Sequence, residues 1–182
     1  MKKEAQSVIL HGDCWNNNFM FKYEDENKNS PSNVKILDWQ LSQLLSPVID
    51  LSYFIYINSS QSELDQLDEL LETYYFSFSE FLRELGSKAE ELFTFEDLKR
   101  HWNKYCAFGA LFTPYVLKFV LCDKETAPAF EDLQEGQGIG AVIMDIHLSD
   151  METYYKRAKA VLAHYFNNKK GMSNLPGPFG NN

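Results

Sequence analysis

The chain has 182 residues, 45% of them hydrophobic, so it is long and apolar enough to bury the core of one domain of ordinary size. This composition excludes a wholly disordered chain. Its 17 lysine and arginine residues against 26 aspartate and glutamate residues give a formal net charge of -9, which argues against sequence-independent binding to nucleic acid or anionic lipid surfaces.

Three features predict a cytoplasmic protein. The cysteines, Cys14, Cys106 and Cys122, are odd in number and widely spaced, which is typical of reduced thiols rather than of a disulfide framework or a zinc site. The residues before His11 are too few and too polar to form the apolar core of a secretory signal. The apolar run at 105–122 approaches membrane-spanning length but contains a glycine, a proline and a lysine, so we interpret it as a buried, kinked core helix.

The first predicted elements are two strands joined by a polar turn. Residues 19–23 and 34–39 are short and rich in aromatic and β-branched side chains, and the segment between them is polar. This pattern is typical of a β-hairpin.

The rest of the chain is predicted to be helical. Residues 48–58 follow Ser46-Pro47 and are almost continuously apolar, which indicates a helix buried on most sides. The later predicted helices are, in chain order, 62–86, capped by Ser62 with Asp65 and ended by Gly86; 94–113, capped by Thr94 with Asp97 and resuming after Pro114 to residue 122; and 149–166, capped by Ser149 with Glu152.

The predicted fold class is therefore α+β, mostly α-helical, with one small hairpin. We assign residues 1–170 to a single lobe. Residues 171–182 mix glycine, proline and asparagine, so we expect them to form a flexible tail.

The residues that could carry chemistry gather around the hairpin. Asp13 and Asn18 are five positions apart, the spacing at which a catalytic loop of a kinase carries the aspartate that accepts a hydroxyl proton and the asparagine that binds Mg²⁺. Asn18 opens the first predicted strand and Asp38 lies near the end of the second, so antiparallel pairing brings the two together. Mg²⁺ prefers such hard oxygen ligands. We therefore expect a magnesium site at this end of the hairpin, with Asp13 within reach of a substrate hydroxyl.

Each of these residues also has a plainer interpretation. Asp13, Asn18 and Asp38 could be a polar turn and a strand-end aspartate, and Asp50 could be an ordinary first-turn helix aspartate. Cys14 has no matched histidine and is interpreted as a packing residue. The aromatic side chains at 74, 75, 78 and 81 are expected to be core, although some could line an acceptor pocket.

Two segments, HGDCWNNNFMF from His11 and VKILDWQLSQLLSPVIDLSYFIY from Val34, resemble the ecdysteroid kinase-like family, a branch of the choline kinase and aminoglycoside phosphotransferase superfamily. The resemblance extends from about Val8 to Phe166 and is most specific before Ser60. It implies the helical C-terminal lobe of a protein-kinase-like fold. Trp39 stands where the family usually has phenylalanine, an exchange that keeps an aromatic ring.

The resemblance also implies an activity and a role for each site residue. The activity is an ATP- and Mg²⁺-dependent transfer of a phosphoryl group to a hydroxyl of a steroid or another lipophilic small molecule. By this matching Asp13 is the catalytic base, His11 supports the loop, Asn18 and Asp38 hold magnesium, and Asp50 anchors the loop by hydrogen bonds from the start of the following helix.

Only ten residues precede His11, whereas this fold places its glycine-rich phosphate loop and strand lysine before the catalytic loop. We therefore expect the N-terminal lobe to be missing from this chain. The chain by itself should bind MgATP weakly at most, and it should expose apolar surface around the hairpin and Trp39. The alternative function is a non-catalytic helical module, or a degenerate kinase fragment, that binds a lipophilic ligand or a partner.

Overall fold

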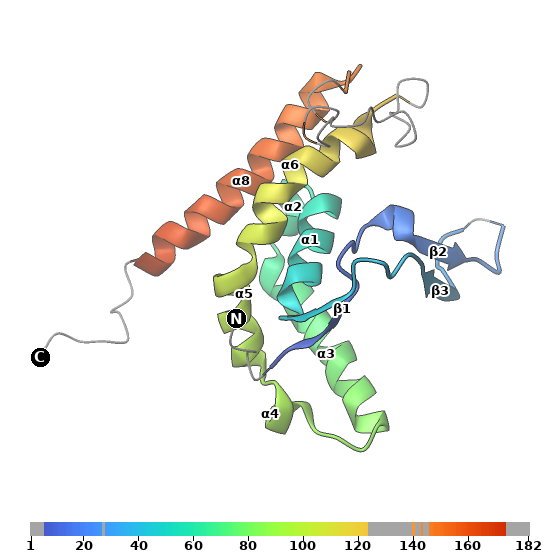
Figure 1. Cartoon of the computed structure of the whole chain (residues 1–182), viewed down its shortest axis with the longest axis vertical. Helices are drawn as coiled ribbons and strands as arrows, with labels where there is room; N and C mark the ends of the chain where they lie inside the picture. The colour runs from blue at the N-terminus through green and yellow to red at the C-terminus, as the bar shows by residue number, and fades with distance from the viewer. Residues whose placement is uncertain (1–5, 27, 124–139, 141–142, 144–145, 174–182) are drawn as a thin grey trace, which may run out of the picture. The chain divides into compact units, whose positions relative to one another are not determined.

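The structure is a computed structural model that describes residues 6–26, 28–123, 140, 143 and 146–173. The described part is mostly helical with two small antiparallel sheets (Figure 1). This confirms the predicted α+β, mostly α-helical class. The chain divides into two compact units, the first formed by residues 1–55 and 68–109 and the second by residues 56–67 and 110–182.

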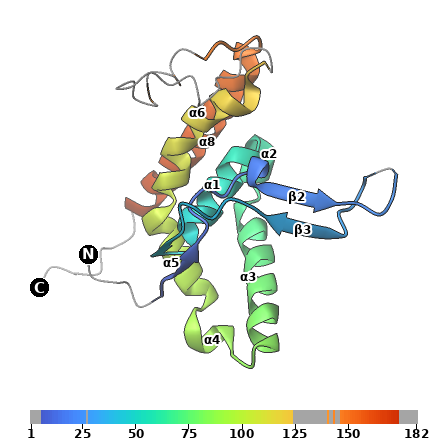
Figure 2. The ribbon, with the colours of Figure 1, turned by 45° about the vertical axis from the view of Figure 1, so that its right-hand side comes forward.

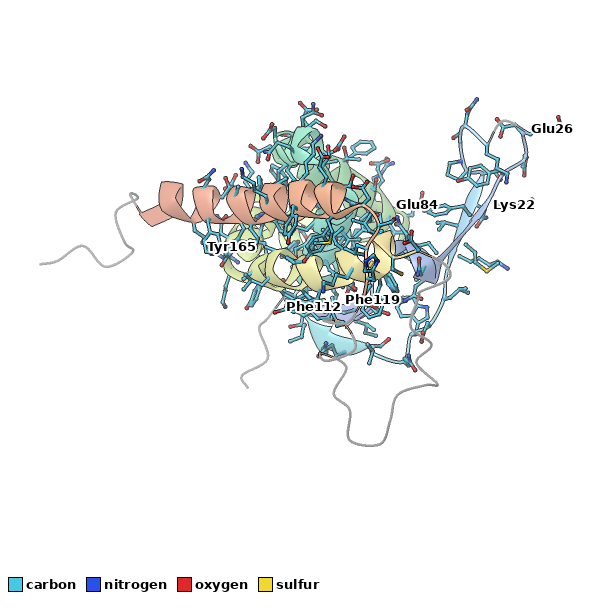
Figure 3. All side chains as sticks on the ribbon, turned by 90° about the horizontal axis from the view of Figure 1, so that it is seen from above. Lys22, Glu26, Glu84, Phe112, Phe119 and Tyr165 are labelled. Atoms are coloured by element: carbon cyan, nitrogen blue, oxygen red, sulfur yellow. The ribbon has the colours of Figure 1, made fainter. Side chains whose placement is uncertain are left out.

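The predicted hairpin is present in the first unit. Strand β2 (Phe19–Lys22) pairs antiparallel with β3 (Asn33–Ile36), so Phe19 lies opposite Ile36. The second strand ends earlier than predicted, and Asp38 lies just beyond it. The hairpin extends away from α1 (Val48–Asn58) and α3 (Leu67–Glu84), with Lys22 and Glu26 toward its far end (Figures 1 and 3).

A second two-stranded sheet was not predicted. Strand β1 (Val8–Leu10) pairs antiparallel with β4 (Gln43–Leu45). Each strand has only three residues and shows no usable alternation of apolar and polar side chains, so the pattern carries too little signal. The pairing matters because it fixes both ends of the segment that contains the hairpin.

Helix α1 (Val48–Asn58) has the predicted bounds and is buried on most sides, as expected. Ser46 caps its start, because the Ser46 hydroxyl oxygen lies 3.3 Å from the Val48 nitrogen that donates to it. The same hydroxyl lies 2.8 Å from Nδ1 of the buried His101. Gly109 packs so closely on this helix that a Cβ there would lie 2.4 Å from the Ser52 carbonyl carbon.

The helix predicted at 62–86 is two helices, α2 (Gln61–Leu64) and α3 (Leu67–Glu84). The predicted cap at Ser62 with Asp65 is wrong: Ser60 begins α2 and pairs with Glu63, whose Oε2 accepts from the Ser60 nitrogen at 2.8 Å. Both serines are good capping residues, so the sequence alone did not separate them. Gly86 ends α3 with φ +78°, as predicted.

Three helices follow, namely α4 (Ala89–Leu92), α5 (Phe95–Tyr105) and α6 (Ala107–Leu121). The cap of α5 by Thr94 with Asp97 is confirmed by two reciprocal bonds of 3.0 Å. The predicted helix break at Pro114 is wrong, since α6 runs through Pro114 and the boundary between helices lies at Cys106 instead. Pro114 removes one helical hydrogen bond, but the buried face formed by Ala110, Thr113 and Leu117 continues on both sides of it.

The last described helix, α8 (Met151–Ser173), lies beside α6 in Figures 1 and 2. Its cap is Asp150, which accepts from the Thr153 nitrogen at 2.9 Å, and not Ser149, whose hydroxyl donates to Asp123. The helix continues past the predicted end at 166, and 171–173 are helical. The remaining residues of the predicted tail, 174–182, lie outside the described residues.

Two predictions on composition can be compared with the structure. Cys14, Cys106 and Cys122 are free thiols, as predicted. Within the described ranges, no helix has both the length and the apolar character that a membrane crossing requires.

Candidate active site in the first unit

The loop that follows β1 carries the candidate catalytic residues. It runs from His11 through a short 3-10 turn at Asn16–Asn18 into β2. Gly12 has φ +87°, and a Cβ at this position would lie 2.2 Å from the Leu41 carbonyl oxygen. Only glycine fits there, for conformational and steric reasons together. The loop is thereby held against the segment that leads into β4.

Asp50, in the first turn of α1, binds the backbone of the loop. Its Oδ2 accepts from the His11 nitrogen at 2.6 Å, and its Oδ1 accepts from the Gly12 nitrogen at 3.0 Å. Charge-assisted bonds of this length are stronger than neutral ones. This is the contact that the family resemblance implies for Asp50, and it fixes the loop on the most buried helix of the unit.

His11 links the two segments that carry the acidic residues. Its imidazole is 4% exposed, and Nδ1 accepts from the Asp13 nitrogen at 3.2 Å. Because Nδ1 is the acceptor, Nε2 carries the proton and donates to the Leu37 carbonyl at 2.6 Å. The ring also lies 4.9 Å from the ring of Trp39, centroid to centroid. His11 thus holds both the loop and the residue before Asp38.

The Asp13 carboxylate is held by three donors. Trp15 Nε1 and Asn18 Nδ2 donate to its Oδ2 at 3.2 Å and 3.0 Å, and the Tyr53 hydroxyl lies 3.4 Å from Oδ1. Asn18 Nδ2 also lies 2.9 Å from the Asp13 carbonyl oxygen. The two shorter bonds fix Oδ2, so Oδ1 is the oxygen with more room for a substrate hydroxyl.

Trp15 and Tyr53 are partners of Asp13 that were not predicted from the sequence. Tyr53 is 3% exposed, and burial together with the charge of Asp13 raises the pKa of its hydroxyl well above the ordinary range, so it stays protonated and can donate. Tyr53 lies three positions after Asp50 on α1, one helical turn away and on the same side. That spacing was the available signal.

The ends of the hairpin bring Asn18 and Asp38 near one another along the backbone. The Leu37 nitrogen donates to the Asn18 carbonyl at 2.9 Å, which extends the β2–β3 ladder by one pair. Asp38 follows directly, with φ +61°, an unusual conformation for a residue other than glycine. Its side chain is exposed, and Oδ2 accepts from Gln40 Nε2 at 3.3 Å.

Asn18 and Asp38 carry the oxygen donor types that Mg²⁺ prefers when it keeps water or phosphate ligands. The Asn18 amide nitrogen faces Asp13, which leaves its side-chain oxygen as a metal donor, and the Asp38 carboxylate is accessible. In the part of the chain that the structure describes, no three carboxylate, imidazole or thiol groups gather to hold a metal ion. One amide and one carboxylate are nevertheless a usual protein contribution for Mg²⁺ bound with a nucleotide.

A cavity of about 300 Å³ lies beside the loop. Its walls are mostly apolar and include Phe19, Leu51, Phe54 and Tyr74, together with Cys14. Burial and the charges of Asp50 and Asp13 raise the pKa of the Cys14 thiol to about 12, so the thiol is neutral at physiological pH. Cys14 thus packs in the wall of the cavity and is a poor nucleophile.

Comparison with known proteins finds a family match over this same part of the chain. Residues 1–87 match the model of the ecdysteroid kinase-like family. The match contains the loop, the hairpin and α1, and the wider resemblance through Phe166 stays a prediction. No curated protein and no solved structure matches the chain. The resemblance inferred from the sequence is confirmed for residues 1–87, which are similar to the ecdysteroid kinase-like family, and this similarity suggests kinase-type phosphotransferase chemistry.

Proposed function

We propose that the chain contributes the catalytic residues of an ATP-dependent phosphotransferase that acts on a hydroxyl of a steroid or similar lipophilic small molecule. The observation that supports this most is the loop itself. Its aspartate is oriented by three donors, and its backbone is fixed by Asp50 and His11. Phosphoryl transfer requires mainly such positioning.

In the proposed reaction, the oxygen of the acceptor hydroxyl attacks the γ-phosphorus of ATP, and Oδ1 of Asp13 accepts the proton of that hydroxyl. A new oxygen–phosphorus bond forms, the bond between the γ-phosphorus and the bridging oxygen breaks, and ADP leaves with that electron pair. Asn18 and Asp38 would hold Mg²⁺, which neutralises phosphate charge when it is bound. His11 and Asp50 keep Asp13 in place.

The lipophilic acceptor is supported by the cavity beside the loop. A volume of about 300 Å³ is at the lower end of the range for small-molecule sites, and its walls are apolar, as such sites usually are. We place the apolar body of the acceptor there, against Phe54 and Tyr74.

The test is transfer of the γ-phosphoryl group from MgATP to a panel of hydroxylated steroids and other lipophilic alcohols, by the chain fused to a complete kinase N-terminal lobe that supplies the nucleotide contacts. Asp13→Asn should lower the rate by roughly 10²- to 10⁴-fold, because the base is lost while the side chain keeps its size. Asp25→Asn, an exposed position in the hairpin turn, makes the same charge change and should leave the rate unaltered.

Equal transfer by the Asp13→Asn and wild-type chains would remove Asp13 from the mechanism. Saturable binding of a lipophilic alcohol without any transfer would contradict the kinase proposal and favour a non-catalytic binding module.

A further inference from the structure

The second unit contains a larger cavity that the proposed kinase chemistry does not use. It has a volume of about 530 Å³ and lies between the start of α2, at residues 60–62, and one face of α8. The two helices are in contact within this unit. The volume is within the range of small-molecule sites and far exceeds the space of a single water.

The spacing of residues on α8 explains the cavity. The lining residues Thr153, Lys156, Arg157, Ala160 and Ala163 follow one another at steps of three or one, so they share one side of the helix. The two alanines are short and leave the space open. The longer Thr153 and Lys156 side chains lie toward the N-terminal end of this face.

The charge of the lining is opposite to that of the whole chain. Lys156, Arg157 and Lys159 line the cavity, whereas the chain has a formal net charge of -9. Within the described residues, Lys156 and Lys159 have no ion-pair partner, unlike Lys22, Lys88 and Lys99. Arg157 donates to the Ile57 carbonyl, so its guanidinium is held at the wall.

The acidic groups of α2 are bound within their own helix. Both oxygens of Glu63 accept from serine side chains, Oε2 from Ser60 at 2.5 Å and Oε1 from Ser62 at 3.1 Å. These bonds lower the pKa of Glu63 to about 2, so it is ionised at neutral pH. Asp65 accepts from Gln61 Nε2 at 2.7 Å. Neither carboxylate lines the cavity. Both follow directly after the lining residues 60–62, so they repel an incoming anion only weakly through solvent.

We propose that this cavity binds a small phosphomonoester with a hydroxylated body. The ammonium groups of Lys156 and Lys159 contact the phosphoryl oxygens, since lysine binds phosphate as a mobile point charge. Ser60, Ser62 and Gln61 line the opposite wall, and because their donors are bound to Glu63 and Asp65, it is their side-chain oxygens that accept from the hydroxyls of the ligand. The cavity is too large for inorganic phosphate alone to fill, which favours an organic ester.

The experiment uses the full chain and glycerol 3-phosphate at low ionic strength, with binding followed by calorimetry and by NMR shifts of backbone amides. Saturable binding should shift the amides of residues 60–62 and 153–163. The double variant Lys156→Gln/Lys159→Gln should bind at least roughly tenfold more weakly, because two charge-assisted bonds are lost. No nucleotide or acceptor is present, so the result does not depend on the proposed kinase function.

Two controls separate this site from general attraction to positive charge. Lys99→Gln/Lys104→Gln makes the same charge change on α5 and should bind as the wild type does. Ala160→Leu fills the cavity without changing charge and should weaken binding. Circular dichroism verifies that each variant is folded.

Three results would overturn the proposal: no saturable binding, an equal loss in both lysine double variants, or shifts confined to other residues. The same phosphoryl chemistry occurs in lipid headgroups, so vesicles containing phosphatidate form a second arm. Binding to those vesicles without binding to glycerol 3-phosphate would exclude the small phosphomonoester as the occupant.

Discussion

The two segments that bring acidic side chains to the candidate active site are held very differently. The loop at 11–18 is fixed by Asp50 through two backbone bonds, and Asp13 itself accepts from three side chains. The segment after β3, at 37–44, is exposed throughout: Asp38 accepts a hydrogen bond of 3.3 Å from Gln40 Nε2, and the neighbouring Trp39 is 50% exposed.

This difference indicates which half of the site is formed in advance. The orientation of Asp13 does not depend on any ligand, whereas the side chain of Asp38 is free to move until something binds it. Preorganised groups lose little entropy when a substrate arrives, while mobile groups lose more. We therefore expect Asp13, the proposed base, to be oriented before Asp38, the proposed metal ligand, with His11 connecting the two segments.

The largest expected effect comes from the steric fit of the loop. Gly12→Ala adds a Cβ that would lie 2.2 Å from the Leu41 carbonyl at φ +87°, so we expect a loss of about 3–5 kcal/mol of unfolding free energy from strain and overpacking together. Gly86→Ala is the matched control, because Gly86 also has a positive φ but has nothing within 4 Å of the added atom. It should cost about 1 kcal/mol. Urea unfolding measures both, and equal losses would mean that the contact with Leu41 is unimportant.

The next largest effect is the difference in stability cost between removing the carboxylate of Asp50 and removing that of Asp38. Asp50→Ala leaves the His11 and Gly12 nitrogens without their acceptor, which should cost about 2–4 kcal/mol of stability. Asp38→Ala should change stability by less than about 0.5 kcal/mol, as is usual at exposed positions. The same unfolding measurement applies. A cost for Asp38 as large as that for Asp50 would contradict the contrast between the two segments.

The smallest effect concerns the donor that faces Oδ1 of Asp13. Tyr53→Phe removes the hydroxyl at 3.4 Å but keeps the ring and its contact with Phe108, so stability should fall by no more than about 1 kcal/mol. Phosphoryl transfer should fall by about three- to tenfold through kcat with KM unaltered, since the hydroxyl orients the base and does not bind the acceptor. A change in KM alone would assign Tyr53 to substrate binding instead.

The sequence predicted those parts of the site that depend on local spacing. Asp13 and Asn18 lie in one loop, and the hairpin brings Asn18 close to Asp38, so their proximity follows from a single turn. The pairing of β1 with β4 was missed because it joins two three-residue strands that are far apart in sequence. Tyr53 was not assigned to the site because its apolar neighbours on α1 indicated a core residue. Its spacing of three from Asp50 places it on the side of α1 that faces the loop, but the contact with Asp13 depends on how the loop folds back onto the helix.

Helix ends were also predicted only in part, because local sequence does not always decide which residue caps a helix. Thr94 with Asp97 was identified correctly, whereas Ser62 and Ser149 were chosen over Ser60 and Asp150. In both wrong cases two suitable capping residues lie one or two positions apart. Their intrinsic preferences are nearly equal, so tertiary packing decides between them.

The most direct test of the account is whether Asn18 and Asp38 share one divalent ion. Paramagnetic Mn²⁺ added to the full chain with ATP should broaden the NMR signals of Asn18, Leu37 and Asp38 first, and Asp38→Asn should abolish that selectivity. Signals of Gly86 should stay sharp at the same Mn²⁺ concentration. Broadening that spreads over the acidic helix surfaces and spares Asn18 and Asp38 would contradict the metal assignment.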